Sequence, residues 1–441
     1  MRSERGGADP AAGDGGGAHA PRRIPAWAAW LVLAAAVGAA VALALGTPAG
    51  VHPDEIDHFE AVRYFQRHAW PPPPGSDAVW YSAYGWSRVY SGEWIYWAIG
   101  RLSAAAAGVD PAAASLRAAR LLNALSLVAL LAPLLFGRSR FFRLDLCGVF
   151  LASIPQVVYV ASYLDDDAWT MATAAALLRV ALGVYERDGR GGWAPFGLLL
   201  GLALGAKRNA WVIVPFALAL AMAGWRRSPA RRWRGPLGAL LLALALVAPL
   251  RLVYPLSQPG DFGAALAAMR SERARPDLDP SAPSAPGFRL RARGAGIDEV
   301  LLAADWWKRS AGSAYGLFGA MTLVAPRPLY LAAAALGLLL AGLQLEAWWR
   351  RARGDPEPRG RILAGAAAAV VAMVAAAVFH SWSFDYQPQG RYLFPALAPL
   401  ALLVTGLDSP RPRLRAGVLA ALALTAAATL AWAWTALVAA G

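Results

Sequence analysis

Long apolar runs separated by short polar connections occupy most of the chain. A helix needs roughly 20 apolar residues to cross the core of a bilayer, and about eleven runs approach that length. The pattern predicts an all-α polytopic transmembrane helix bundle that forms one integral membrane domain over residues 24–441. The pair 194–206 and 210–224 is short, so its boundaries are the least defined. The runs lie near residues 27–45, 118–136, 144–162, 168–185, 194–206, 210–224, 236–256, 328–346, 362–379, 393–407 and 416–438.

The first 23 residues differ from this pattern. They are rich in Gly, Ala and Asp, have no apolar periodicity, and predict a disordered cytoplasmic tail over residues 1–23. Arg22 and Arg23 then precede the first run, which leaves a cleaved signal peptide as an alternative. Because the run is long for a signal sequence, we expect an uncleaved span with its N-terminus in the cytoplasm.

Composition supports a membrane protein. Hydrophobic residues make up 58% of the chain, charged residues make up 16%, and the mean hydropathy is +0.41. The single cysteine, Cys147, lies within an apolar run, so the chain has neither a disulfide framework nor a thiol-based metal site.

Arginine supplies almost all of the positive charge behind the net charge of +14, and the positions of the arginines along the chain explain this excess. If the N-terminus is inside, most connections assigned to the cytoplasm contain several arginines, as the positive-inside rule requires. We therefore expect no nucleic-acid partner, and we expect the C-terminus to lie outside. These arginines are Arg138, Arg140 and Arg143; Arg226, Arg227, Arg231, Arg232 and Arg234; Arg350, Arg351 and Arg353; and Arg411, Arg413 and Arg415.

The same alternation places the groups of polar side chains on the outer face. An outer loop over about 50–115 contains an aromatic-rich amphipathic stretch, from Trp80 to about Ala107, that is expected to lie along the membrane surface. These aromatic rings are expected to anchor the chain at the lipid headgroups, and they can also stack on sugars. The other outer segments are Tyr163–Asp167, the turn at residues 207–209, a loop over about 257–327, and His380–Arg391.

The stretch His52–Glu60 follows the first span directly and contains four carboxylates and two imidazoles. Pro53 suits the first position of a helix, and such a helix would place Asp54, Asp57 and His58 on one face. A solvated helix beside the membrane is the simpler interpretation. It explains neither the density of charge nor its position at a membrane exit.

A second acidic run, Asp165-Asp166-Asp167, stands between the third and fourth spans. Adjacent carboxylates repel one another unless a cation balances them. Asp165 can cap the following helix, but capping accounts for only one of the three acids. Together with the first acidic stretch the run is a candidate general-base or divalent-metal site, with Asp165 and Asp166 as ligands for Mg²⁺ or Mn²⁺.

Several cations share this face and are candidates for binding phosphate. Lys207 and Arg208 form a turn, and Arg391 lies in the segment Gln387–Tyr392, although an arginine at a helix end more often reaches toward the interface. Lys308 follows Trp307, where an interfacial anchor is the default interpretation. Acids to activate a hydroxyl, cations for phosphate and aromatic rings for sugars fit transfer from a lipid-linked phosphosugar.

These motifs resemble the GT-C superfamily of membrane glycosyltransferases. Three elements are similar to a bacterial family of predicted multi-pass membrane proteins of unknown function that is thought to be GT-C-like. They are Pro53-Asp54-Glu55-x-x-His58-Phe59, Trp307-x-x-x-x-Gly312-x-x-Tyr315-Gly316 and Gln389-Gly390-Arg391-Tyr392-Leu393-Phe394-Pro395.

The resemblance implies a sugar donor linked to polyprenyl phosphate. It implies that Asp54 is the catalytic base with Glu55 beside it, and that Asp165, Asp166 and Asp167 form the second acidic motif, which binds a metal or orients the acceptor. His58, Tyr392 and Trp307 are expected to support the site.

The sequence therefore predicts a glycosyltransferase at the outer face of a bacterial inner membrane, acting on a glycan, lipid or protein acceptor. A transporter or flippase of lipid-linked saccharides is the alternative, because the break at Gly205–Ala210 is typical of transporters. A non-catalytic scaffold for polysaccharide assembly is a third.

Overall fold

The structure is a computed structural model that describes residues 23–107, 112–228, 232–279, 289–352 and 358–439. The predicted tail over residues 1–23 lies outside these residues except for Arg23. Its α-helices are α1 (Ala26–Gly46), α2 (Glu55–Arg67), α3 (Trp94–Ala107), α4 (Ala112–Leu135), α5 (Leu144–Ala152), α6 (Pro155–Ser162), α7 (Asp166–Glu186), α8 (Trp193–Leu204), α9 (Val214–Arg227), α10 (Arg234–Ala248), α11 (Tyr254–Ser257), α12 (Phe262–Arg273), α13 (Trp306–Gly316), α14 (Arg327–Ala352), α15 (Arg359–Ser383), α16 (Leu397–Thr405) and α17 (Pro412–Ala439).

Shorter elements connect these helices. Two residues of β1 (Leu317–Phe318) pair antiparallel with β2 (Leu323–Val324). The short helical turns are η1 (Arg88–Ser91), η2 (Arg208–Ile213), η4 (Leu290–Arg293) and η6 (Gly390–Ala396), and the π-helical turns are η3 (Pro249–Val253) and η5 (Glu299–Ala303).

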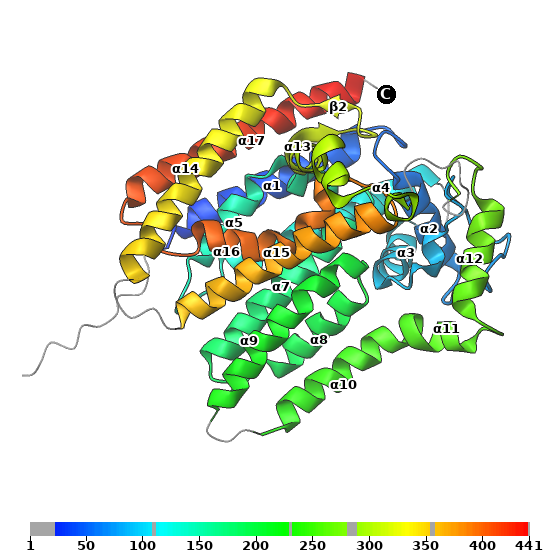
Figure 1. Cartoon of the computed structure of the whole chain (residues 1–441), viewed down its shortest axis with the longest axis horizontal. Helices are drawn as coiled ribbons and strands as arrows, with labels where there is room; N and C mark the ends of the chain where they lie inside the picture. The colour runs from blue at the N-terminus through cyan, green and yellow to red at the C-terminus, as the bar shows by residue number, and fades with distance from the viewer. Residues whose placement is uncertain (1–22, 108–111, 229–231, 280–288, 353–357, 440–441) are drawn as a thin grey trace, which may run out of the picture.

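The long helices lie side by side and alternate in direction along the chain (Figure 1). Helix α1 runs toward the end of the bundle where α2 and α3 lie, α4 runs away from it, and α17 finishes there. We call this the α2 end. The arginine-rich connections, such as the one between α4 and α5, lie at the opposite end. The start of α1 and the end of α17 therefore lie at opposite ends of the bundle, as the sequence predicted.

Every predicted apolar run is helical, but not every run is long enough to cross a membrane. In the described residues eight helices have the length and hydropathy of a span, or nine if α5 and α6 form one broken span. Helix α8 has 12 residues, and the continuous segment η6–α16 covers Gly390–Thr405. At about 1.5 Å per residue neither reaches the roughly 30 Å of a bilayer core. The predicted number of about eleven full spans is therefore too high.

Helix α7 lies at the centre of the bundle. In its most apolar window 78% of the residues are buried, compared with 17% for α14, so α14 presents most of its surface outward. The largest core cluster packs Leu177 of α7 together with side chains of neighbouring helices, such as Leu127 and Tyr159. On the far side α10 packs closely on α8, because Gly197 has no side chain and the backbone of Ala239 occupies that space. The position of α7 brings Asp165, Asp166 and Asp167 to the middle of the α2 end.

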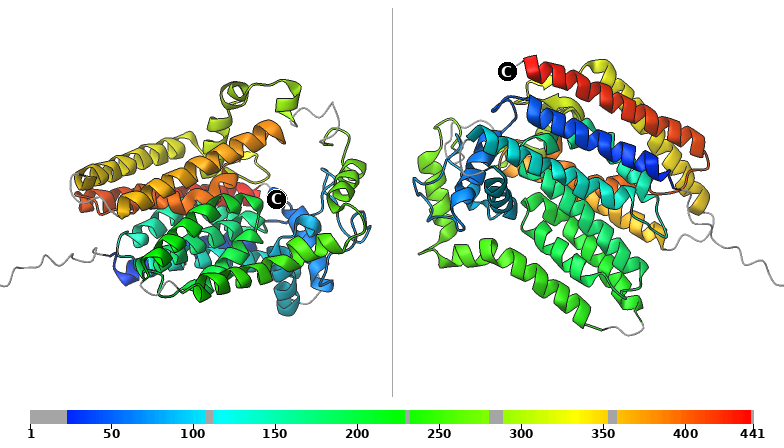
Figure 2. Two further views of the ribbon diagram at one scale, coloured as in Figure 1. Left: turned by 60° about the horizontal axis from the view of Figure 1, so that its bottom comes forward. Right: turned by 180° about the vertical axis from the view of Figure 1, so that it is seen from behind.

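A second, smaller core holds the segments outside the long helices together. It contains Phe59, Val62 and Phe65 of α2 and Tyr96 and Ile99 of α3. Figure 2 shows these segments, with α12, gathered beyond the ends of the long helices. The aromatic stretch divides accordingly, because Tyr90 and Tyr96 are buried here whereas Trp80 and Trp97 are exposed. The predicted amphipathic helices of the first loop are confirmed, and they cover the α2 end.

Candidate functional site

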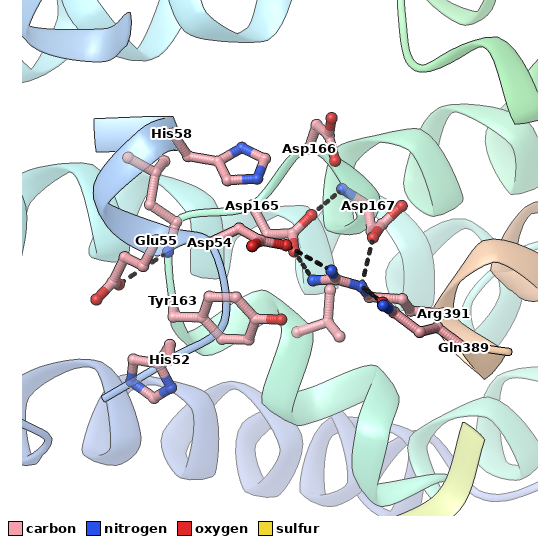
Figure 3. Close-up of polar contacts among 12 residues, drawn as sticks. His52, Asp54, Glu55, His58, Tyr163, Asp165, Asp166, Asp167, Gln389 and Arg391 are labelled. Atoms are coloured by element: carbon pink, nitrogen blue, oxygen red, sulfur yellow. Dashed lines mark hydrogen bonds and ion pairs between the residues drawn. The ribbon is translucent and has the colours of Figure 1, made fainter. Parts of the chain in front are cut away.

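Arg391 is the centre of a buried group of charges at the α2 end (Figure 3). Its Nη1 donates to Asp165 Oδ2 at 2.9 Å and its Nη2 donates to Asp54 Oδ2 at 2.8 Å. Its Nε donates to Gln389 Oε1 at 2.8 Å and lies 3.6 Å from Asp167 Oδ2. One guanidinium therefore joins the two acidic motifs that the sequence singled out. Arg391 is only 8% exposed, so it does not reach toward the membrane interface.

Gly390 explains how Arg391 reaches this position. A Cβ atom on Gly390 would lie 2.4 Å from the backbone nitrogen and from the Cβ of Ala314, so only glycine fits against α13. The backbone nitrogen of Gly390 also donates to Ser313 Oγ at 2.8 Å. Gly390 therefore lets the backbone of η6 approach α13 closely, and this contact fixes η6 against α13.

Asp54 precedes helix α2 and is not part of it. The helix begins at Glu55, and Asp54 adopts a left-handed backbone with φ of 58° that makes no side-chain cap. The predicted helix start at Pro53 is therefore wrong, and so is the shared face of Asp54, Asp57 and His58. The ion pair with Arg391 holds the carboxylate away from the helix. Burial raises the pKa of Asp54, but the charge and hydrogen bond of Arg391, with the charges of His58 and Arg88, together outweigh it, so this pKa lies below its ordinary value.

Asp165 caps the N-terminus of α7 by accepting a hydrogen bond from the backbone nitrogen of Asp167 at 2.6 Å. The other two acids of the run turn toward Lys207. Its Nζ donates to Asp166 Oδ1 at 2.9 Å and to Asp167 Oδ1 at 2.8 Å. All three carboxylates are 1% exposed. Lys207 and Arg391 are thus the cations that balance the repulsion among the three adjacent carboxylates.

Three further side chains, His58, Tyr96 and Arg88, complete the charged group. Tyr96 lies between His58 Nδ1, at 2.8 Å, and Asp166 Oδ2, to which it donates at 3.2 Å. Arg88 donates to the same Asp166 oxygen at 3.4 Å. Both come from the aromatic stretch of the first loop, where the aromatic pattern pointed only to membrane anchoring. Arg88 and Asp166 are far apart in the chain, so no local sequence pattern predicts their ion pair.

His58 is buried against this group, and its burial makes the stability of the protein depend on pH. Burial, with the charge of Arg88, lowers the pKa of His58 from 6.5 to about 3, despite the opposite effect of Asp166 and Asp54. The folded state therefore prefers the neutral imidazole, and the unfolded state binds more protons between these two values. This contribution to stability is complete above pH 6.5 and decreases as the pH falls toward 3.

We expect the melting temperature of the detergent-solubilised protein to fall between pH 6.5 and pH 4, and this fall to be smaller in His58→Gln. One histidine contributes at most about 1.4 kcal/mol per pH unit. Intrinsic fluorescence during heating measures the effect, and an equal slope in the two proteins would contradict it.

Glu55 lies in a different environment from Asp54. It is fully buried and accepts two hydrogen bonds from Arg120 of α4, at 2.7 and 2.6 Å. Arg120 also donates to the carbonyl oxygens of Ala44, Thr47 and Pro48 at the end of α1. Figure 3 shows Glu55 pointing away from Arg391. This geometry fits a residue that fixes the junction of α1, α2 and α4. Arg120 lies inside the apolar run 118–136, and an arginine in such a run indicates a buried acidic partner.

Breaking this ion pair is expected to destabilise the protein strongly. Arg120→Met leaves the buried Glu55 charge unpaired, which costs about 3–5 kcal/mol of unfolding free energy. Chemical denaturation in mixed micelles measures this loss. The double variant Glu55→Gln/Arg120→Met is expected to recover only part of it, because the three carbonyl oxygens stay unpaired. A double variant as unstable as Arg120→Met would contradict the assignment.

The remaining predicted site residues lie in different places. Tyr392 places its ring 4.8 Å from Lys207 Nζ and belongs to the site. Arg208 is exposed and makes no ion pair among the described residues. Trp307 is 48% exposed, and the Lys308 side chain is 83% exposed with Asp305 as its ion-pair partner at 3.8 Å. The structure therefore brings Lys207, Arg391 and Tyr392 together, while Arg208, Trp307 and Lys308 face outward.

Two cavities border η6. A polar cavity of about 20 Å³, large enough for one water molecule, is lined by Arg391, Gln389, Tyr163 and Pro53 among others. An apolar cavity of about 350 Å³ lies on the other side and is lined by Gly390, Ala314, Leu393, Met373 and Leu400 among others. Gly390 lines the apolar cavity and the next residue, Arg391, lines the polar one. The charged guanidinium therefore lies beside the apolar cavity along the chain.

The acids fit a divalent metal poorly. His58, Asp165 and Asp166 are the cluster with ligand atoms mutually within 4.8 Å among the described residues. However, both oxygens of Asp166 and Oδ2 of Asp165 already accept hydrogen bonds from Lys207, Arg88, Tyr96 or Arg391. Mg²⁺ and Mn²⁺ prefer octahedral oxygen ligands, and Mg²⁺ keeps several of its waters, whereas the buried oxygens of Asp166 and Oδ2 of Asp165 are already bound by cationic or hydroxyl donors. The residues present therefore do not fit the expected metal.

The fold and the site define a polytopic membrane protein with a buried ionic site at one end of its helix bundle. The chain belongs to the family described as "Predicted membrane protein (DUF2142)", whose profile matches residues 89–401. The match begins after His52–Glu60 and includes the motifs at Trp307 and Gln389. It confirms the resemblance to a family of predicted membrane proteins.

Two solved structures have a similar fold. They are ArnT from Cupriavidus metallidurans bound to undecaprenyl phosphate, with a TM-score of 0.56, and ArnT from the same organism in the apo state, with a TM-score of 0.53. Both are 16% identical to this chain, and each comparison covers 94% of this chain and 77% of ArnT. At this identity the similarity shows the fold alone, and it confirms the GT-C-like fold that the sequence motifs implied. A search of curated proteins found no match.

Proposed function

We propose that the protein is a membrane glycosyltransferase. In this proposal it moves a sugar from a polyprenyl-phosphate donor to an acceptor hydroxyl at the outer face of a bacterial inner membrane. The single observation that carries the proposal is the position of Arg391. It holds the candidate base Asp54 at 2.8 Å and borders a polar cavity, while its neighbour Gly390 borders an apolar one.

The two cavities suit the two parts of a lipid-linked sugar. Arg391 has a planar fork of donors that matches a phosphate, and in the structure its two Nη atoms each donate to one carboxylate, those of Asp165 and Asp54. The apolar cavity of about 350 Å³ gives a hydrocarbon chain a place beside η6, between α15 and α16. The likeness to ArnT, whose structure contains undecaprenyl phosphate, supports a polyprenyl-phosphate partner.

The reaction follows from the contacts of Asp54. Its Oδ2 is held by Arg391, so a phosphate that binds Arg391 competes with this ion pair and releases the carboxylate. Asp54 then accepts the proton of the acceptor hydroxyl, and the hydroxyl oxygen forms a bond to the anomeric carbon of the sugar. The bond between that carbon and the phosphate oxygen breaks, and the electron pair leaves with the phosphate. Attack opposite the leaving phosphate inverts the anomeric carbon.

The outer location of the site is inferred from the distribution of arginine among the connections between helices. The connections with several arginines lie at the end of the bundle opposite to Asp54 and Arg391. Because arginine-rich connections remain in the cytoplasm, the site then faces outward. The acceptor, whether a glycan, a lipid or a protein, is a component of the cell envelope in this proposal.

A transporter of lipid-linked saccharides is the second candidate, because the structure contains broken helices. Helices α5 and α6 meet at an angle of 70°, and α8 ends at a turn before η2. Transporters form their midplane binding sites from such breaks. Here the paired carboxylates gather instead at the α2 end of the bundle, at the start of α7 and before α2, which favours chemistry at the surface.

The test is an assay with the full-length protein in liposomes that contain a polyprenyl-phosphate sugar labelled in the sugar. Extracts of the bacterial envelope supply the acceptor. A new labelled glycosidic product, identified by mass spectrometry, is the expected result. Redistribution of the label between the leaflets without a product identifies a transporter and overturns the proposal. If neither a product nor redistribution of the label is observed, the remaining candidate is a non-catalytic scaffold, and the proposal is also overturned.

A further inference from the structure

The cation position within the acidic run is already filled by a side chain. Lys207 Nζ bridges Asp166 Oδ1 at 2.9 Å and Asp167 Oδ1 at 2.8 Å. Asp166 is also one of the three residues whose ligand atoms lie mutually within 4.8 Å. The ammonium group therefore lies at the cluster where a divalent ion would be expected from the residue types alone.

The turn that carries Lys207 is fixed from three directions. The Lys207 backbone nitrogen donates to Thr170 Oγ1 of α7 at 3.4 Å. The preceding carbonyl oxygens accept hydrogen bonds, Gly205 O from Trp94 at 3.1 Å and Ala206 O from Arg251 at 2.6 Å. On the following side Asn209 donates to the Tyr392 carbonyl oxygen at 3.2 Å. Such a turn holds the ammonium group in one place, unlike a lysine on a solvated surface.

The donors of Lys207 are directed inward. An ammonium group has three N–H donors, and two of them bind Asp166 and Asp167 while the group also faces the ring of Tyr392. Its side chain is 18% exposed. Burial lowers the pKa of Lys207, but Asp166 and Asp167 raise it above its ordinary value, so the group stays charged. Lys207 is therefore occupied with the acids, which leaves the phosphate to Arg391.

We propose that the ammonium group of Lys207 takes the place of a divalent metal ion, so that the site works without one. The inference rests on the proposed function for the reaction that the site performs. The choice of cation is a property of the folded protein and is measurable without any substrate. By pairing with Asp166 and Asp167, Lys207 leaves Arg391 to pair with Asp165 and Asp54 and to bind a phosphate.

The first measurement uses the wild-type protein and Mn²⁺. Titration followed by electron paramagnetic resonance is expected to show no stoichiometric Mn²⁺ binding. The melting temperature is expected to stay the same in EDTA and in millimolar Mg²⁺ or Mn²⁺. A single bound Mn²⁺ per chain, or a melting temperature that EDTA lowers, overturns the inference whether or not any variant folds.

The second measurement uses Lys207→Met, which removes the charge and keeps most of the side-chain volume. The freed carboxylates then have a vacant cation position, so we expect Mn²⁺ to bind at least about tenfold more tightly than to the wild type. Mn²⁺ is also expected to raise the melting temperature of this variant. Lys207→Arg keeps the charge and is expected to gain no Mn²⁺ affinity. If Lys207→Met gains none either, the inference is wrong.

Arg63→Ala is the matched control, because it removes a cation from a surface pair with Glu60 at 2.9 Å. It is expected to gain no Mn²⁺ affinity, which shows that an unpaired carboxylate alone is insufficient. Failure of sugar transfer overturns the proposed function and leaves the Mn²⁺ results unchanged. Mn²⁺ binding by the wild type overturns only the inference about Lys207.

Discussion

Asp54→Asn is expected to abolish sugar transfer while the protein still folds. The amide keeps the shape of the carboxylate but cannot accept the acceptor proton, so kcat is expected to fall by at least about 1,000-fold. KM for the donor is expected not to rise, because Arg391 remains to bind the phosphate and the neutral amide competes with the phosphate less than the carboxylate does. Initial rates with the labelled donor in liposomes measure both quantities.

Asp57→Asn is the control for this variant. Asp57 lies three residues further along the chain, and its Oδ1 accepts a hydrogen bond from Trp80 at 2.8 Å. It is expected to retain transfer and a normal melting temperature. Transfer by Asp54→Asn within a few-fold of the wild type would exclude Asp54 as the base, even if the protein is a glycosyltransferase.

Arg391→Lys is expected to be the second most damaging change to activity. Lysine keeps one positive charge, but its ammonium group lacks the planar fork of donors with which the guanidinium pairs with Asp54 and Asp165 and would bind a phosphate. Removing one such stabilising donor from a developing oxyanion typically costs at least about 100-fold in rate. We expect a loss of this size in kcat/KM, with a higher KM for the donor.

Arg273→Lys is the matched control, because Arg273 pairs with the exposed Asp77 at 2.7 Å on the surface. A loss of activity confined to Arg391→Lys supports a phosphate-binding role for the guanidinium. If Arg391→Lys transfers sugar at the normal rate but melts at a lower temperature, Arg391 only stabilises the fold. In that case the phosphate site lies elsewhere.

The helices could be predicted from the sequence because a segment in a bilayer has to satisfy its own backbone hydrogen bonds. An apolar run such as 27–45 has to be helical in a bilayer, whatever the rest of the chain does. The run at 194–206 shows the limit of this argument. Its apolar pattern predicts a span, but α8 begins at Trp193 and ends at Leu204, so it is too short. The turn at Lys207 ends the helix because its backbone is bonded to α7 and α3.

Within the site, residue type and spacing identified Asp54, the acids Asp165–Asp167, Lys207 and Arg391, which the structure brings together. They did not distinguish Asp54 from Glu55. The two are adjacent in the chain, yet one carboxylate meets Arg391 and the other meets Arg120. This difference depends on the left-handed backbone of Asp54 and on an arginine that lies 65 residues further along the chain.

The sequence by itself therefore determined the membrane class, the helical runs and the set of charged residues that share one end of the bundle. These follow from local hydropathy and from the distribution of arginine, both of which act over one span or one connection. Only the tertiary structure decided which charge meets which. Ion pairs join residues such as Asp54 and Arg391 that are far apart in the chain, and their geometry depends on how α7, η6 and the segment before α2 pack. For the same reason only the structure showed that Lys207 occupies the cation position among the acids.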